Sequence, residues 1–163
     1  MKNIVAVIDV GTLKTKFEVR DYSSEKNGKL LHRDKFLTVL GRDLDKTGNL
    51  IIEKSIKITT EALLAIKSKM KELDVVSYKA VTTEAIRRAK NAIEVLEKIK
   101  DKTGIELITL THQEEAKILF ESISKDFKNR IIAVADIGGG SVQLVIGKNN
   151  QCNFILFDRK RCG

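Results

Sequence analysis

The chain has 163 residues and a formal net charge of +8 at neutral pH, with 42% hydrophobic and 32% charged residues. This length and composition are typical of one folded domain and exclude a largely disordered or fibrous chain. No stretch approaches the roughly 20 apolar residues that cross a bilayer, and the first apolar run is too short for a signal peptide. We therefore expect a cytoplasmic protein without a membrane anchor, organised as a single domain over residues 1–163.

The positive charge favours polyanionic partners, a class that includes nucleic acid, polyphosphate, nucleotides and acidic membrane surfaces. Nucleic acid ranks last, because the aromatic residues show no stacking pattern and no groove-reading motif is present. The two cysteines, Cys152 and Cys162, have neither the spacing of a zinc site nor the number of a disulfide framework. We expect both to be reduced thiols without a functional role.

The first part of the chain predicts three strands. Residues 4–8 form a continuous apolar run, typical of a strand buried on both faces, and a glycine-containing turn follows. Phe17 and Val19 alternate with charged residues, which predicts a half-buried strand that pairs back as a hairpin. A third strand is expected over residues 30–37.

From residue 53 onward, helical and strand patterns alternate. Apolar residues at steps of three and four predict helices, and Thr, Asn and Gly residues mark their ends. The expected elements are a helix over 53–73, a strand at 78–81, a helix through 87 capped by Thr82 and Thr83, a helix from Asn91 to Gly104, a strand over 105–110 and a helix over 113–124. Residues 131–135 then repeat the opening apolar pattern and lead through a glycine-rich turn into a strand over 142–146. This order predicts an α/β fold with a mixed sheet.

Two similar turns follow the two apolar strands, one beginning at Asp9 and the other at Asp136. Glycine lets the backbone approach a ligand closely and frees N–H groups to point at phosphate oxygens. The hydroxyls of Thr12 and Ser141 add donors, and an aspartate at a strand end can hold a hydrated Mg²⁺. Each turn alone is typical of a tight hairpin, but the pair facing one cleft predicts a phosphate site that is neither a P-loop nor a dinucleotide fingerprint.

A carboxylate at the start of the helix over 113–124 is a candidate base. Thr111 and Glu114 have the spacing of a capping box, which gives Glu114 a structural role. Glu115 has no such role, and near a phosphate site it can orient and deprotonate an attacking water. The alternative interpretation of Glu115 is an ordinary acid that interacts with the helix dipole. We expect His112 to be a surface residue.

Arg87 and Arg88 form the third candidate feature. The fork of an arginine fits phosphate oxygens in pairs and stabilises charge in a transition state. The alternative interpretation of this pair is a solvated helix face.

Taken together, these segments resemble the exopolyphosphatase/guanosine pentaphosphate phosphohydrolase family, a branch of the actin-like ATPase superfamily. AVIDVGTLKTKFEV is similar to its first phosphate loop, AVTTEAIRRAKNA to its threonine–arginine segment, LTHQEEAKILF to its catalytic-glutamate helix and AVADIGGGSVQLVIG to its second phosphate loop. The resemblance spans nearly the whole chain. It implies a ribonuclease H-like (actin-like ATPase) domain with a mixed five-stranded sheet and helices on both faces.

The resemblance also implies a reaction, namely stepwise hydrolysis of terminal phosphoanhydride bonds in polyphosphate, or removal of the 5′ γ-phosphate of guanosine pentaphosphate, with Mg²⁺. On this match Glu115 is the base that activates water. The implied phosphate ligands are Gly11, Thr12, Arg87, Gly139, Gly140 and Ser141, and the implied metal ligands are Asp9 and Asp136. The expected partners are therefore polyphosphate or a guanosine polyphosphate nucleotide.

Three departures from the family pattern bear on activity. Leu13 and Lys14 stand where the family has Asn and Ser, and Gln143 stands where it has Glu. Family members also place the active site between two such domains, whereas this chain has roughly one, with residues 154–163 resembling the strand that leads into the second. We therefore expect a missing second domain or a homodimer, because a half-site leaves Glu115 in water, where electrostatic catalysis is weak.

Two alternatives to hydrolysis remain open. Leu13, Lys14 and Gln143 favour a non-catalytic phosphate or nucleotide sensor, which would bind a polyanion without turnover. An actin-like assembly or kinase fragment is the other alternative, and it predicts dependence on ATP.

Overall fold

The structure, a computed structural model, describes residues 2–24, 27–149 and 151–159. Its contacts divide the chain into two compact units, Met1–Thr109 (unit 1) and Leu110–Gly163 (unit 2), and each unit has a hydrophobic core of its own. The prediction that residues 1–163 act together as one domain stays a prediction. In the described part of the chain, no helix is both long and apolar enough to span a bilayer.

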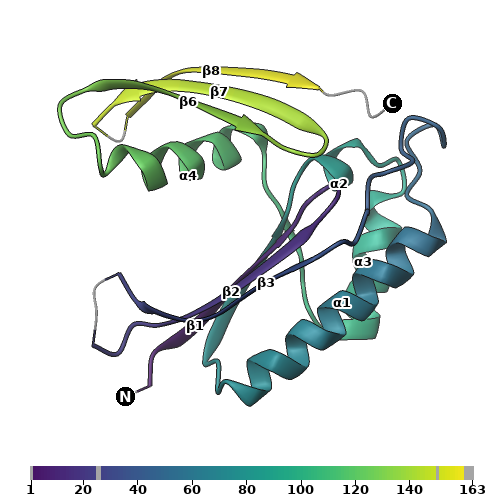
Figure 1. Ribbon diagram of the computed structural model, residues 1–163. Helices are drawn as coiled ribbons and strands as arrows, with labels where there is room; N and C mark the ends of the chain where they lie inside the picture. Colours follow the sequence, from purple (N-terminus) through teal and green to yellow (C-terminus); the bar gives the residue numbers. More distant parts are fainter. Residues whose placement is uncertain (1, 25–26, 150, 160–163) are drawn as a thin grey trace. The chain divides into compact units, whose positions relative to one another are not determined.

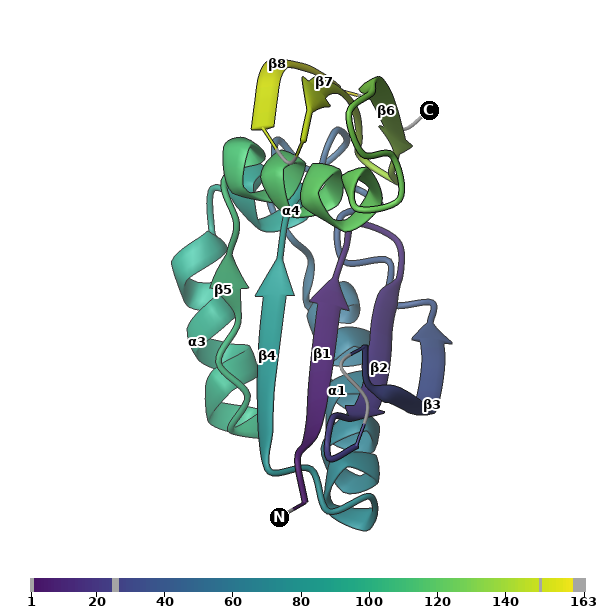
Figure 2. The same ribbon diagram turned by 90° about the vertical axis from the view of Figure 1, so that its left-hand side faces the viewer.

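Unit 1 is built on a mixed five-stranded sheet (Figure 2). Its strands are β1 (Ile4–Val10), β2 (Thr15–Asp21), β3 (Lys29–Phe36), β4 (Ser77–Thr82) and β5 (Ile108–Thr109), in the order β3-β2-β1-β4-β5. The three N-terminal strands pair antiparallel, whereas β4 is parallel to β1 and to β5. The predicted α/β fold with a mixed five-stranded sheet is confirmed.

Three helices complete unit 1: α1 (Glu53–Glu72), α2 (Glu84–Arg88) and α3 (Ala92–Thr103). The two long helices, α1 and α3, contact each other and lie on the same face of the sheet (Figure 1). Alternate residues of β1, from Ile4 to Val10, are buried in the core that also holds Leu63 and Ile66 of α1. This burial follows from the two-residue period of a strand meeting the apolar stripe of a helix.

The predicted helix ends are nearly all correct in position. Gly104 ends α3 in the left-handed conformation, with φ of 71°, and its N–H donates to the Lys100 carbonyl. Thr83 and Asn91 occupy the N-cap positions of α2 and α3, but neither side chain makes a capping hydrogen bond. The Thr82 hydroxyl instead donates to the Val10 carbonyl at 2.9 Å, which ties β4 to the end of β1.

The strand expected over residues 105–110 is wrong in length, since β5 comprises only two residues. The Ile105 N–H donates to the Thr103 hydroxyl at 3.0 Å and so belongs to the turn after α3. Ile105 and Leu107 are nevertheless buried in the core. The apolar run therefore reflects burial and not extended sheet pairing.

Unit 2 consists of a three-stranded antiparallel sheet and one helix. The strands are β6 (Ile131–Ile137), β7 (Ser141–Lys148) and β8 (Gln151–Arg159), in that order, and the helix is α4 (His112–Ser124). The predicted capping box is confirmed: the Glu114 N–H donates to the Thr111 hydroxyl, and the Thr111 N–H donates to the Glu114 carboxylate. Ala116 and Phe120 of α4 are buried in the core of this unit.

Cys152 lies in β8 and is a free thiol, as predicted. Burial, with the nearby Glu121 carboxylate, raises the pKa of this thiol above its ordinary value, which disfavours the reactive thiolate. Cys162 lies outside the described residues, as does the end of the segment 154–163.

Candidate phosphate site

The two predicted phosphate turns share an equivalent backbone hydrogen bond. Residues 11–14 (loop 1) join β1 to β2. Residues 138–141 (loop 2) join β6 to β7 and include Ser141, the first residue of β7. In loop 1 the Gly11 N–H donates to the Lys14 carbonyl at 3.0 Å, and in loop 2 the Gly138 N–H donates to the Ser141 carbonyl at 2.9 Å. The likeness of the two turns in sequence is therefore also a likeness in hydrogen bonding.

Loop 1 has little space for a side chain at its first glycine, and loop 2 has more. Neither Gly11 nor Gly138 is among the glycines with positive φ. A Cβ atom at Gly11 would lie 3.1 Å from the Lys14 carbonyl oxygen, and one at Gly138 would lie 3.4 Å from that of Ser141. Gly11 thus allows loop 1 to close tightly on itself, whereas loop 2 has room for a Cβ at Gly138. The close approach to a ligand predicted from sequence stays a prediction.

The segment that follows β3 forms backbone hydrogen bonds to loop 1. The Gly41 N–H donates to the Thr12 carbonyl, and the Val39 N–H donates to the Leu13 carbonyl, both at 2.9 Å. Thr12 is buried, whereas Lys14 is exposed. Of the loop residues, Lys14 is thus the one whose charged side chain is open to solvent.

The two aspartates face different partners across their hairpins. Asp9 lies opposite Lys16, and the Lys16 ammonium is 3.4 Å from the Asp9 carboxylate. Asp136 lies opposite Gln143, the residue at the corresponding place in the second hairpin. The first aspartate therefore has a cation beside it and the second an amide.

Arg87 lies in α2 with a mostly buried side chain, of which 13% is exposed, and its guanidinium lies 3.3 Å from the buried Glu84 carboxylate. Arg88 is buried to a similar degree, so the solvated-face interpretation of this pair is wrong. Because α2 follows β4 and loop 1 follows β1, its parallel neighbour, both lie at the carboxyl ends of adjacent strands, a common place for ligand sites.

Gly41 joins these parts of unit 1. A Cβ at this position would lie 2.7 Å from the Thr12 Cγ2 atom and 3.0 Å from the Ala85 Cβ atom. Loop 1 and α2 therefore approach each other with Gly41 between them. The structure thus brings Thr12 close to the helix that carries Arg87.

In unit 2, α4 lies along β7 with its first turn at the loop 2 end. The His112 ring packs edge-on against Phe157, which pairs with Gln143, and a Cβ at Gly147 would meet the Phe120 ring. The distances agree, because the helix from His112 to Phe120 and the strand from Gln143 to Gly147 each span about 12–14 Å. His112 is half-buried, so its prediction as a surface residue is wrong.

Glu115 therefore stands at the same end of unit 2 as loop 2. It belongs to the first turn of α4, where its N–H donates to the Thr111 carbonyl at 3.0 Å, and it is half-buried. In loop 2, Gly140 and Ser141 are buried and Gly139 is partly exposed. A carboxylate, a glycine-rich loop and a hydroxyl thus gather at one end of the unit.

The Gln143 side chain is buried without hydrogen bonds from its amide group to any residue that the structure describes. It is 2% exposed, and among the described residues neither its amide nitrogen nor its amide oxygen has a hydrogen-bond partner. A buried polar group without a partner costs free energy, about 1–3 kcal/mol. An amide in this state, opposite Asp136, has donor and acceptor capacity left for a ligand.

The donor set at Asp136 fits a hydrated divalent cation. Mg²⁺ binds oxygen ligands, keeps several waters and needs only one or two carboxylates from the protein. Asp136 and Gln143 present one carboxylate and one amide oxygen from paired strands. Asp9 fits less well, because the Lys16 ammonium competes for its carboxylate, and the described residues contain no cluster of three or more His, Cys, Asp or Glu side chains.

Two contributors to the site are missing from the sequence predictions. Lys16 has a usable signal, since the short hairpin loop places it directly opposite Asp9. The segment at Val39 and Gly41 has none, because it acts through backbone N–H groups on a loop that lies far earlier in the sequence. Such contacts leave no local pattern.

The sheet order and the two matched hairpins define a ribonuclease H-like domain of the actin-like ATPase class. The model of the Ppx/GppA phosphatase family matches residues 21–156. The chain belongs to the Ppx/GppA phosphatase family.

The chain is also similar in sequence to individual proteins named as phosphatases. The chain is 28% identical over 159 residues to Exopolyphosphatase 1 of Mycobacterium bovis, covering 93% of this chain and 44% of that protein. It is 27% identical over 155 residues to the bifunctional 3-dehydroquinate synthase/phosphatase of Fusobacterium nucleatum, covering 87% of this chain and 23% of that protein.

The crystal structure of the Aquifex aeolicus Ppx/GppA phosphatase, type II variant, superposes with a TM-score of 0.82 at 29% identity. That match covers 95% of this chain and 51% of the Aquifex chain. The chain therefore spans about half or less of the length of these relatives.

Proposed function

We propose that this chain is one half of a two-domain phosphatase that hydrolyses terminal phosphoanhydride bonds of a polyphosphate chain. The observation that carries the proposal is the pair of hairpin loops with the same hydrogen bonding, in a member of a phosphatase family. Inorganic polyphosphate is the favoured substrate, because the Mycobacterium bovis relative is named an exopolyphosphatase. The 5′ γ-phosphate of guanosine pentaphosphate is the second candidate.

Each loop has a role in binding phosphate. In loop 1 we assign Gly11 and Thr12 to phosphate oxygens, with Arg87 of the neighbouring helix as the charged ligand. The buried Glu84 holds the Arg87 guanidinium in one orientation, and an oriented fork binds phosphate oxygens at a smaller entropic cost. In loop 2 we assign Gly139, Gly140 and Ser141 to the same task.

Glu115 is the proposed general base. Its carboxylate would accept a proton from the water that attacks the terminal phosphorus, while the bridging oxygen leaves with the shortened chain. Its place in the first turn of α4, at the loop 2 end of unit 2, supports this role. The neighbouring Glu114 is already engaged in the capping box, so it is not a competing candidate.

A divalent cation, most simply Mg²⁺, would be held by Asp136 with the Gln143 amide oxygen, and Asp9 is the second candidate ligand. Such a cation neutralises the charge that develops on the phosphate oxygens. The protein contributes a carboxylate and an amide from paired strands of the hairpin. Because Gln143 is uncharged, we expect the site to bind the cation weakly.

A second domain, or a second copy of the chain, would complete the protein. The outer face of the β6–β8 sheet exposes large apolar side chains, namely Ile131, Ile137, Phe154 and Leu156. The matching positions of β1, in the first of the two similar hairpins, are buried beneath α1 in unit 1. Relatives about twice as long could supply the cover from their second half, and an exposed apolar face of this kind is rare in a complete monomer. A monomer in light scattering at micromolar concentration would contradict the second-copy version.

The competing function is a phosphate sensor without turnover, which the neutral Gln143 and the apolar Leu13 favour. The test is to incubate the chain with long-chain polyphosphate and Mg²⁺ while measuring both phosphate release and the melting temperature. Hydrolysis predicts release that rises with time, and the sensor predicts a raised melting temperature with no release. If polyphosphate causes neither phosphate release nor a raised melting temperature, both functions are contradicted.

A further inference from the structure

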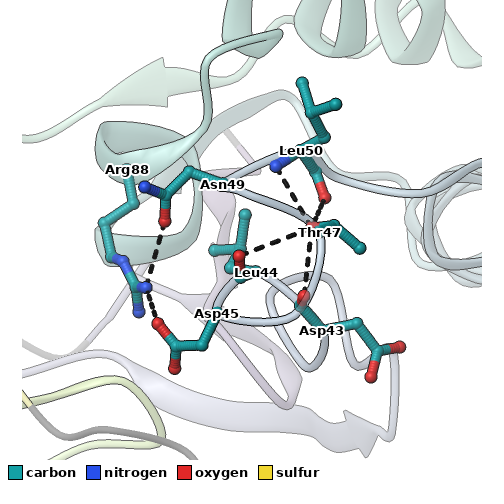
Figure 3. Close-up of polar contacts among 7 residues, drawn as sticks. All are labelled: Asp43, Leu44, Asp45, Thr47, Asn49, Leu50 and Arg88. Atoms are coloured by element: carbon teal, nitrogen blue, oxygen red, sulfur yellow. Dashed lines mark hydrogen bonds and ion pairs between the residues drawn. The ribbon is translucent and has the colours of Figure 1, made fainter.

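Residues 38–51 connect β3 to α1 and carry no regular secondary structure; we refer to them as the strap. Figure 3 shows that Arg88 of α2 points into the strap. A single guanidinium nitrogen, Nη2, donates to the Asp45 carboxylate and, at 3.2 Å, to the Asn49 amide oxygen. The Arg88 side chain is only 10% exposed, so this is a largely desolvated charge with a matched partner.

The residues after Arg88 strengthen the same attachment. The Lys90 N–H donates to the Asn49 carbonyl at 2.8 Å. The Asn91 side chain accepts from the Ile51 N–H and donates to the Ile51 carbonyl, both at 3.0 Å. Segment 88–91 therefore holds the second half of the strap through side-chain and backbone hydrogen bonds.

The strap is also braced from within (Figure 3). The Thr47 hydroxyl lies within hydrogen-bond distance of the carbonyls of Asp43 and Leu50, either of which can accept its one proton, and it accepts from the Leu50 N–H at 3.2 Å. The Asn49 N–H donates to the Leu44 carbonyl at 2.8 Å. The Leu44 N–H also donates to the Gly41 carbonyl at 3.4 Å, so residues 43–50 are joined to the first half of the strap.

The first half of the strap holds loop 1. Besides the N–H groups of Val39 and Gly41, which donate to loop 1 carbonyls, the Thr38 and Thr15 hydroxyls form a buried hydrogen bond of 3.0 Å. Val39 has φ of 50°, a left-handed conformation that a β-branched residue adopts only when its surroundings impose it. The Ser55 hydroxyl, which donates to the Val39 carbonyl, is one of those constraints.

We propose that the strap fixes the shape of loop 1 and that Arg88 is the positioning residue that anchors it, a proposal that rests on phosphate binding by loop 1. The two neighbouring arginines then have different tasks. Arg87 binds phosphate oxygens, and Arg88, whose guanidinium is engaged by Asp45 and Asn49, acts on phosphate only through the strap and loop 1. Loss of Arg88 should weaken phosphate binding without removing a phosphate contact.

The first arm of the test measures the affinity of the full chain for long-chain polyphosphate in Mg²⁺ at several salt concentrations. Each phosphate contact by a cation adds about one to the slope of log affinity against log salt. Arg87→Gln should lower this slope by about one. Arg88→Gln should weaken binding roughly five- to tenfold with an unchanged slope, as expected for loss of a charge-assisted hydrogen bond that orients the loop.

Two further variants control this arm. Arg88→Lys should restore most of the affinity, because one nitrogen makes both contacts in the structure and an ammonium can replace it. Arg33→Gln removes an exposed β3 arginine that pairs with Glu18, and so matches the loss of one charge and one ion pair without touching the strap. It should leave affinity within about twofold of wild type.

The second arm measures amide hydrogen exchange in the free protein. In Arg88→Gln, exchange at Val39 and Gly41, whose N–H groups bind loop 1, should accelerate, while amides of β1 stay unchanged. This arm needs no ligand. If the wild-type chain does not bind polyphosphate, the proposed function fails, and this arm alone still decides whether Arg88 anchors the strap.

Each outcome of the two arms either supports or overturns the positioning role of Arg88. Weaker binding with an unchanged salt slope, rescue by lysine and faster exchange at Val39 and Gly41 support the positioning role. A slope lowered by about one in Arg88→Gln would make Arg88 a direct phosphate ligand and overturn the proposal. Behaviour equal to that of Arg33→Gln in both arms would overturn it as well.

Discussion

Gln143 is the residue at which the chemistry of the site is most open to change. Its buried amide lies opposite Asp136 and, among the described residues, has no hydrogen-bond partner. The resemblance to the family predicts a carboxylate at this place, and a neutral amide weakens the attraction for a cation. A carboxylate at position 143 would therefore bind a cation more strongly than the glutamine that is present.

Gln143→Glu should create a metal-dependent protein. Without metal, the introduced carboxylate is buried opposite Asp136, and like charges in that arrangement lower the melting temperature by several degrees. With Mg²⁺ the stability should return, and the apparent affinity for Mg²⁺ should rise about tenfold relative to wild type. Thermal melts in chelator and across a Mg²⁺ titration measure both effects.

The matched control is Gln113→Glu, which adds the same charge at an exposed position in the first turn of α4. It should show no Mg²⁺-dependent gain in melting temperature. If Gln143→Glu behaves like this control, Asp136 and Gln143 do not form a metal site.

At this scale, sequence reasoning succeeded where the partner is close along the chain. Thr111 and Glu114 are three residues apart, so the capping box could be predicted from spacing alone. Arg88 and its partners Asp45 and Asn49 are 43 and 39 residues apart. No local pattern distinguishes such a buried arginine from a solvated one, and the sequence therefore left both interpretations open.

Among the elements, β2 and β3 carry a charged cluster away from the loops. The Glu18 carboxylate accepts hydrogen bonds from Arg20 and Arg33. Burial alone would raise the pKa of Glu18, but the hydrogen bonds and charges of both arginines outweigh it and hold the pKa below its ordinary value of 4.5. Glu18 therefore stabilises the fold in its ionised form.

The sign of the pH effect follows from the lowered pKa of Glu18. Its contribution is present at neutral pH, above the unfolded-state pKa, and is lost as the pH falls through the lower folded-state value. Glu18→Gln should thus lower the free energy of unfolding at pH 7 by less than about 1 kcal/mol, because the pair is partly exposed. Urea unfolding should show the difference shrinking as the pH falls below 4.5. A difference that stays constant with pH would show that Glu18 acts by packing and not by charge.

The elements as a whole followed from hydrophobic period, and the misses have a physical cause. The helices α1, α3 and α4 and the strands β1 and β7 could be predicted because their apolar residues repeat at the period of the element. The predicted length of the fifth strand is too great, because Ile105 and Leu107 are buried but do not pair with any strand that the structure describes. Burial and strand pairing give the same apolar run, and sequence alone does not separate them.

At the scale of the whole molecule, the informative feature is the similarity between the β1–β2 and β6–β7 hairpins. The core-facing residues of β1 and the outer residues of β6 occupy matching positions, with Ile4 corresponding to Ile131 and Val10 to Ile137. In unit 1 that face is covered by α1, whereas in unit 2 it is exposed. The repeat supports the proposal that a second domain, or a second copy of the chain, covers the outer face of β6.

The proposed role of Glu115 as the base that activates the attacking water is tested by the initial rate of phosphate release from polyphosphate in Mg²⁺. Glu115→Gln should lower the rate by a factor of about 10²–10⁴, the usual contribution of a general base, while polyphosphate affinity is kept. Glu114→Gln is the matched control, because glutamine preserves the capping box and should leave the rate unchanged. Equal rates for wild type and Glu115→Gln, both above the rate without protein, would contradict this role of Glu115.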